Sequence, residues 1–120
     1  MSTIVDIGRD KTTIKLFDTK GGEVTLYTSL TFDEQKKLLE GRNLKDQSAE
    51  EGASISIDTI RACFISWNIG KDGKPYECNA ETLGRFTQRD FLAILQACTG
   101  QSMIDENGNI LAPEFIAKKG

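Results

Sequence analysis

Two alternating segments joined by a pair of glycines constrain the fold of this chain more than any other feature. The segments are TTIKLFD (12–18) and EVTLYTS (23–29), and their apolar positions are Ile14, Leu16, Val24 and Leu26. Alternation with a period of two is typical of a β-strand. Gly21 and Gly22 lie between the two segments and permit the positive φ angles of a tight turn. The sequence therefore predicts an antiparallel hairpin near the N-terminus.

A hairpin of two strands is only marginally stable in water, so this one must pack against other elements. The preceding segment STIVDI (2–7) is predicted to add a third, shorter strand. Helical patterns follow the hairpin along the rest of the chain. We therefore expect an α+β fold, in which a small antiparallel sheet of two to three strands packs with three to four helices.

The first predicted helix lies in LTFDEQKKLLEGR (30–42). Thr31 can cap its N-terminus, and Glu34 three residues later completes a capping box. Gly41 provides a stop at the other end. The following segment NLKDQSAEEGAS (43–54) is polar and shows no periodicity, so it is predicted to be a surface loop.

A second helix is predicted over ISIDTIRACFISWN (55–68). Ile57, Ile60, Phe64 and Trp67 recur at spacings of three and four residues, which indicates one buried stripe. In this interpretation Trp67 closes the core at the last helical turn, and its indole N–H binds a carbonyl or water. The alternative is that Trp67 is an exposed anchor for a ligand.

Two further helices are predicted over 79–86 and 87–100, with Asn79 and Thr87 as their N-caps. Asp90 lies three residues after Thr87, and Gly100 is the expected C-terminal stop. Phe86 and Phe91 have the spacing of a hydrophobic staple. The buried face of the last helix is predicted to consist of Phe91, Ile94, Leu95 and Cys98.

Residues 1–100 are expected to form a single globular domain, and residues 101–120 have a different character. Asn107-Gly108 predicts a turn, and hence a small hairpin, but a tail that orders on a partner fits equally well. The apolar residues of this segment are the candidate partner-binding residues, namely Ile104, Ile110, Leu111, Phe115 and Ile116.

Composition argues against several function classes. The net charge is −3, and 15 basic residues are interspersed with 18 acidic ones, which does not suit a nucleic-acid surface. No signal peptide is recognisable, and no apolar run approaches the roughly 20 residues that span a bilayer. Histidine is absent, which removes the commonest general base and metal ligand. Cys63, Cys78 and Cys98 have no CxxC spacing, and two of them lie in apolar helical patterns, so we expect reduced thiols.

Two motifs invite a chemical interpretation, and neither is complete. DENGN (105–109) alternates acidic and amide side chains as a calcium loop does. Its sixth position is Ile110 instead of glycine, and Phe115 and Ile116 stand where the loop needs glutamate. GKDGK (70–74) does not match the phosphate-binding pattern GxxxxGK[ST]. We therefore expect no cofactor, no metal and no enzymatic activity.

Residues 24–99 resemble the tail assembly chaperones of long-tailed bacteriophages. The resemblance rests on a helix ending in Trp-Asn, a DGKP turn, a polar helix start and a closing apolar helix. One element departs from the pattern, since Glu81 precedes Thr82 where the family has a T-x-E order. The matching positions are Trp67, Asn68, Asp72, Gly73, Lys74, Pro75, Glu81, Thr82, Leu83, Phe86 and 91–97.

The resemblance implies a non-catalytic protein in the cytoplasm of an infected bacterial host. Such chaperones keep the long, helical, apolar tape-measure protein soluble and recruit tail-tube subunits to it; self-association is a further expectation. The alternatives are a structural tail or head-tail connector subunit of the virion, and an unrelated bacterial adaptor domain.

Overall fold

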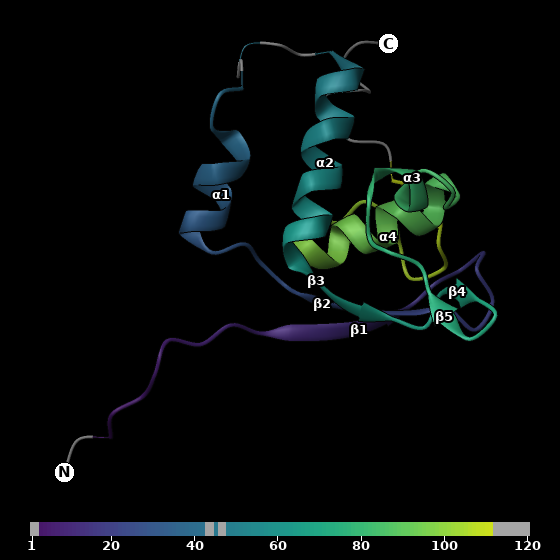
Figure 1. The fold of residues 1–120 in the computed structure, drawn as a ribbon, viewed down its shortest axis with the longest axis horizontal. Coiled ribbons are helices and arrows are strands. Elements are labelled where there is room, and N and C mark those ends of the chain that lie inside the picture. Colours follow the sequence, from purple (N-terminus) through teal and green to yellow (C-terminus); the bar gives the residue numbers. More distant parts are fainter. Residues whose placement is uncertain (1–2, 43–44, 46–47, 112–120) are drawn as a thin grey trace.

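The computed structural model describes residues 3–42, 45 and 48–111. Within these residues the chain has the predicted α+β architecture, with a three-stranded antiparallel sheet, a separate two-stranded sheet and four helices. Figure 1 shows the larger sheet on one side of the molecule and the helices gathered on the other side.

The predicted hairpin is formed by β1 (Lys11–Lys15) and β2 (Glu23–Tyr27). Thr13 faces Thr25 in the antiparallel register, and their hydroxyl oxygens are 2.8 Å apart. Gly21 has a φ of +78° in the connection, as the turn prediction requires. Val24 and Leu26 point into the core and are fully buried, which confirms the predicted buried face of β2.

The third strand of the sheet is β3 (Phe64–Trp67), which pairs with β2. The prediction of a helix through Trp67 was therefore wrong, because α2 (Ala49–Cys63) ends just before this strand. The sequence FISW fits a helical stripe, but its aromatic and β-branched residues also favour strands. The second edge of β2 offers unpaired backbone groups, and pairing with them decides the conformation.

The predicted surface loop over 43–54 was also wrong for its second half. Helix α2 begins at Ala49, and the Ser48 hydroxyl accepts a hydrogen bond from the amide of Glu51. Ser48 and Glu51 have the spacing of a capping box, which indicates a helix start. The next residue, Gly52, disfavours a helix, and it obscured this indication. Residues 43, 44, 46 and 47 lie outside the described part of the chain.

The strand predicted over 2–7 is absent from the described residues 3–7, which form neither helix nor strand. Figure 1 shows this segment running away from the sheet as an extended arm. Its apolar side chains Ile4, Val5 and Ile7 are 80–98% exposed. Strand propensity is satisfied only where a neighbouring strand accepts the backbone hydrogen bonds, and the arm has no such neighbour.

The helix ends follow the predicted capping residues. Thr31 caps α1 (Phe32–Leu39) in a complete capping box with Glu34. Asn79 caps α3 (Ala80–Leu83), and Thr87 caps α4 (Gln88–Thr99). Gly100 ends α4 with a φ of +74°.

The core lies between the sheet and two helices. Helix α4 packs on β1 and β2, α2 packs on α4, and α1 lies beside α2 at the outside of this assembly (Figure 1). The predicted face of α4 is correct, since Ile94, Leu95 and Cys98 are buried and Phe91 packs against them. The core cluster consists of Leu16, Val24, Leu26, Ile60, Cys63, Trp67, Leu83, Ile94, Leu95 and Cys98.

Trp67 closes this core from β3. Its indole N–H donates to the carbonyl of Tyr76 at 2.8 Å, and its ring meets Phe64 and Phe86 edge-on. The core interpretation of Trp67 is therefore confirmed, although the residue lies on a strand.

The segment after Trp67 forms a second hairpin from β4 (Gly70–Lys71) and β5 (Lys74–Pro75). Asp72 and Gly73 have positive φ angles of 55° and 78°, the signs that a type I′ turn requires. The strands approach so closely that a Cβ on Gly70 would lie 2.0 Å from the carbonyl oxygen of Lys74. This segment is therefore compact connecting structure next to the core tryptophan.

Residues 101–111 fold back on α4. The Gln96 side-chain oxygen accepts hydrogen bonds from the amides of Met103 and Ile104, and Ile104 pairs with Ile110 as an antiparallel bridge. Gly108 has a φ of +84° in the turn between them. The turn predicted at Asn107-Gly108 is thus present, and residues 112–120 lie outside the described part.

No helix in the described part of the chain combines the length and the apolar character that a membrane crossing needs.

Candidate functional site

The structure describes three of the five residues predicted to bind a partner. Ile104 is only 5% exposed and packs inside the molecule, whereas Ile110 and Leu111 are 47% and 41% exposed. Phe115 and Ile116 lie outside the described residues. Only Ile110 and Leu111 are thus seen to present apolar surface to solvent.

Exposed apolar surface also lies on α1, a helix that was predicted only to pack with the sheet. No residue of α1 is buried. Phe32 is 79% exposed, and it shares one side of the helix with Gln35, Lys36 and Leu39. These residues and Glu40 line a shallow groove of about 560 Å³. We call this side, formed by Phe32, Gln35, Lys36 and Leu39, the outer face of α1.

The spacing of the outer face carried a signal that could have revealed it. Phe32, Gln35, Lys36 and Leu39 recur at i, i+3, i+4 and i+7, which places them on one side of a helix. Exposure could not be read from the pattern, because an apolar stripe normally packs against the protein's own core.

Arg9 fixes the N-terminal end of α1. Its guanidinium donates to both carboxylate oxygens of Glu34 and to the carbonyl of Ser29, and it lies 3.9 Å from the centre of the Tyr27 ring. Partial burial opposes ionisation of Glu34, but hydrogen bonds from the Thr31 amide and from Arg9 outweigh it and lower the pKa of the carboxyl. Glu34 is therefore charged at neutral pH and joins α1 to the start of β1.

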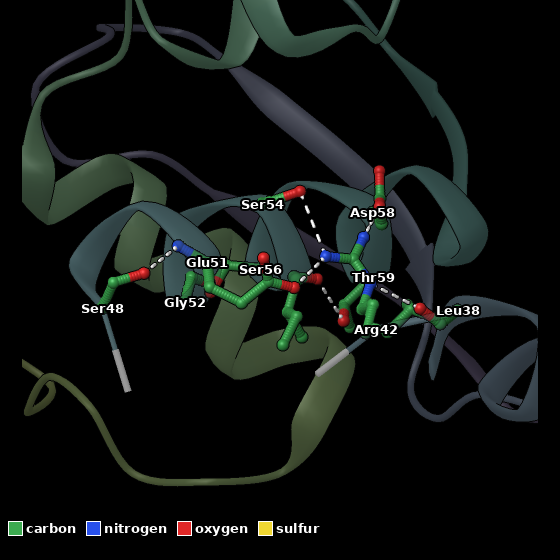
Figure 2. Close-up of polar contacts among 10 residues, drawn as sticks. Leu38, Arg42, Ser48, Glu51, Gly52, Ser54, Ser56, Asp58 and Thr59 are labelled. Carbon is green, nitrogen blue, oxygen red and sulfur yellow. Dashed lines mark hydrogen bonds and ion pairs between the residues drawn. The ribbon is translucent and has the colours of Figure 1, made fainter. Parts of the chain in front are cut away.

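Arg42 fixes the other end of α1 to α2 (Figure 2). Its Nε donates to the carbonyl of Leu38 at 2.6 Å, which satisfies a free carbonyl at the helix end. Its two terminal nitrogens reach α2, where they bind Glu51, Ser54 and Asp58. The Arg42 side chain is largely buried, and its planar guanidinium links the two helices.

An open depression lies between α1 and α2 beside Arg42. It measures about 450 Å³ and is lined by apolar and charged side chains. Leu38 and Ala62 supply the apolar part, and Lys37 and Glu40 are charged groups at its rim. Helix α1 is therefore joined to its surroundings by Arg9 near its start and by Arg42 at its end, with an open depression between it and α2.

The N-terminal arm is the second apolar element outside the core. Ile4 is 95% and Ile7 is 98% exposed, and Asp6 lies between them. The arm leaves the body of the protein at Gly8, next to the anchored Arg9. We define the N-terminal arm as residues 3–8.

Asp90 is the buried carboxylate of the described residues, and it is used within the fold. It accepts hydrogen bonds from the amides of Phe17, Asp18 and Thr19 and from the Thr19 hydroxyl, at 2.7–3.0 Å. Burial opposes its ionisation, but these four donors outweigh that effect and lower the pKa of Asp90. The residue thereby ties the β1–β2 connection to the first turn of α4.

The three cysteines are free thiols. The Cys98 thiol donates a hydrogen bond to Cys63, and this bond together with burial raises the pKa of Cys98, while burial raises the pKa of Cys78 to about 11. Cys78 and Cys98 are thus protonated at neutral pH, which does not suit a nucleophile or a metal ligand. In the part of the chain that the structure describes, no group of three or more His, Cys, Asp or Glu residues is arranged to hold a metal ion.

Comparisons with protein-family models, with curated proteins and with solved structures gave no match for this chain. The outer face of α1 is the main candidate site, and Arg9 and Arg42 hold the two ends of this helix in place.

Proposed function

We propose that this protein is a non-catalytic tail assembly chaperone of a long-tailed bacteriophage, which binds the tape-measure protein in the cytoplasm of the infected host. The outer face of α1 is the observation that carries the proposal. Its residue Phe32 stays exposed on a helix that buries none of its residues, although the chain has a closed core elsewhere. Large exposed aromatic residues are typical of protein interaction sites.

The chemistry of this face suits an apolar helical partner. Phe32 and Leu39 lie two turns apart, and Gln35 and Lys36 between them are polar. A partner helix that packs along α1 would cover the apolar pair and leave the polar groups at the rim. A tape-measure protein is long, helical and apolar, so it offers many such segments. A shallow groove allows reversible binding, which suits a chaperone that leaves the finished assembly. Tail-tube subunits would then be recruited to the complex.

The exposed apolar arm supports an interaction role in a second way. Ile4, Val5 and Ile7 are unpaired in the described structure and offer strand-forming residues to a partner. A structural tail or connector subunit of the virion would use the same feature permanently. An adaptor unrelated to phages would use it with other proteins.

The experiment is coexpression with the tape-measure protein encoded beside this chain, comparing the soluble fraction of that partner with and without it. We expect a soluble complex that copurifies. The Phe32→Ser variant should lose most of the soluble partner, with at least a tenfold drop in affinity. Ile65→Ser is the matched control, because Ile65 is also an exposed apolar residue but lies on β3.

Two results would argue against the chaperone function. An insoluble partner in the presence of the wild-type chain would remove its main support. Recovery of this chain from purified virions would favour the structural subunit instead.

A further inference from the structure

The N-terminal arm presents an apolar residue and an acidic residue that no other part of the described chain covers. Ile4 is 95% exposed, and the Asp6 carboxylate accepts a hydrogen bond only from the adjacent amide of Ile7 among the described residues. In an extended segment residues i and i+2 point the same way, about 6–7 Å apart. In the extended conformation that the arm would take on a partner, Ile4 and Asp6 form one side of it, with the acidic group nearer to the body.

The outer face of α1 presents the complementary pair. Phe32 is 79% exposed, and Lys36 follows one turn later on the same side of the helix. Four residues of an α-helix rise by about 6 Å. Lys36 is exposed and forms no ion pair within the described part of the chain. The apolar and charged groups of the two elements thus match in spacing and are opposite in charge.

The arm of the same chain is not placed to cover this face. Arg9 is fixed by Glu34, Ser29 and the Tyr27 ring, so the arm starts from a defined point. Figure 1 shows the arm running from there away from α1, on the opposite side of the sheet plane from the helices. A second copy of the chain is the occupant that brings an identical arm to α1.

The area of contact indicates how two copies would combine. Specific interfaces bury roughly 1,200–2,000 Å² in total, more than one six-residue arm on one eight-residue helix offers. Reciprocal exchange doubles the area and closes the assembly around a two-fold axis. From these observations we infer that two copies of this chain form a dimer by reciprocal arm exchange, in which Ile4 of each arm packs on Phe32 of the other copy and Asp6 pairs with Lys36.

The dimer is inferred from the exposed and charged side chains of the N-terminal arm and of the outer face of α1. It does not depend on the identity of the tape-measure partner. The exchange also has a consequence for that partner, because both would use the outer face of α1. Arm exchange then shields Phe32 until a partner helix displaces the arm.

The test is the mass of the full-length protein in solution, measured by light scattering and sedimentation velocity. We expect a dimer for the wild type at about 100 μM, a concentration at which a contact of micromolar Kd is occupied. Asp6→Lys and Lys36→Asp should each raise the dimer Kd at least tenfold. Combining the two substitutions should restore the dimer, since the charges are then exchanged.

The matched controls reverse exposed charges elsewhere, with Lys71→Asp in β4 and Glu77→Lys after β5, and should leave the dimer intact. Circular dichroism confirms that each variant is folded. A wild-type monomer at this concentration would overturn the inference, and so would a dimer that neither charge reversal weakens. Failure of the double variant to restore the dimer would exclude the Asp6–Lys36 pair. Tape-measure solubility is a separate readout, so the two proposals can fail independently.

Discussion

Helices α4 and α1 begin with the same chemistry and end in opposite environments. Each is capped by a threonine, and each has an acidic residue at its third position that binds a distant part of the chain. In α4 that residue is Asp90, fully buried against the backbone of the β1–β2 connection. In α1 it is Glu34, which binds Arg9 near the surface.

The difference lies in what the rest of each helix covers. Helix α4 buries five residues, including Ile94 and Leu95, whereas α1 buries none. Capping chemistry therefore decides where a helix starts and says nothing of whether it contributes to the core. The comparison separates a helix that holds the fold together from one whose outer face remains exposed.

The largest expected effect comes from shortening a core residue of α4. Ile94→Ala should lower the free energy of unfolding by about 2–5 kcal/mol, because it removes buried methyl groups and leaves a cavity. Urea denaturation with a two-state fit is the measurement. Leu39→Ala on α1 is the matched control and should cost under about 1 kcal/mol. Equal losses for both variants would show that α1 belongs to the core after all.

The next effect concerns the two acidic residues of the comparison. Asp90→Ala leaves the part-buried amides of Phe17, Asp18 and Thr19 without their acceptor, and we expect a loss of about 3 kcal/mol. Glu34→Ala removes a capping contact and an ion pair near the surface, and its expected cost is about 1 kcal/mol. The denaturant midpoints of both variants give the two losses of unfolding free energy and hence their ratio. A larger loss for Glu34→Ala would reverse the assignment of the two helices.

The same residues predict the response to acid. The folded-state pKa values of Asp90 and Glu34 are both lowered, so their contribution to stability is fully present above the unfolded values of about 3.9 and 4.3. It is lost as the pH falls through the lower folded-state values. The urea midpoint should therefore drop below about pH 4, and Asp90→Asn should flatten this drop. An Asp33→Asn control, which changes an exposed carboxylate of α1, should keep the wild-type profile. An unchanged profile for Asp90→Asn would contradict the prediction.

The smallest effect on stability is expected at the outer face of α1. Phe32→Ala should change the free energy of unfolding by less than about 0.5 kcal/mol, because the ring is largely exposed. Thermal unfolding followed by circular dichroism measures this change. A loss above 1 kcal/mol would mean that Phe32 packs within its own chain, and that would weaken its assignment to a partner surface.

Some features of the fold followed from local sequence. The β1–β2 hairpin, the capping residues Thr31, Asn79 and Thr87, and the stop at Gly100 were predicted correctly. Each depends on contacts between residues close in the chain, and its chemistry can therefore be read from a few neighbouring letters.

Other features depended on partners distant in the sequence. The segment FISW has the periodicity of a helix, yet β2 offers an unpaired edge, and backbone pairing makes the segment a strand. The segment before β1 has strand-forming residues, yet no edge accepts them, and it stays an exposed arm. Ile104 and Phe32 are likewise both apolar in sequence, and only packing makes one buried and the other exposed.

By itself, the sequence determined the α+β class, the hairpin and the starts of α1, α3 and α4, because these arise from local hydrogen bonds and short-range periodicity. The tertiary structure alone decided which strand completes the sheet, where α2 ends and which apolar residues remain outside the core. Those outcomes depend on competition among distant segments for the same backbone edge and the same interior space.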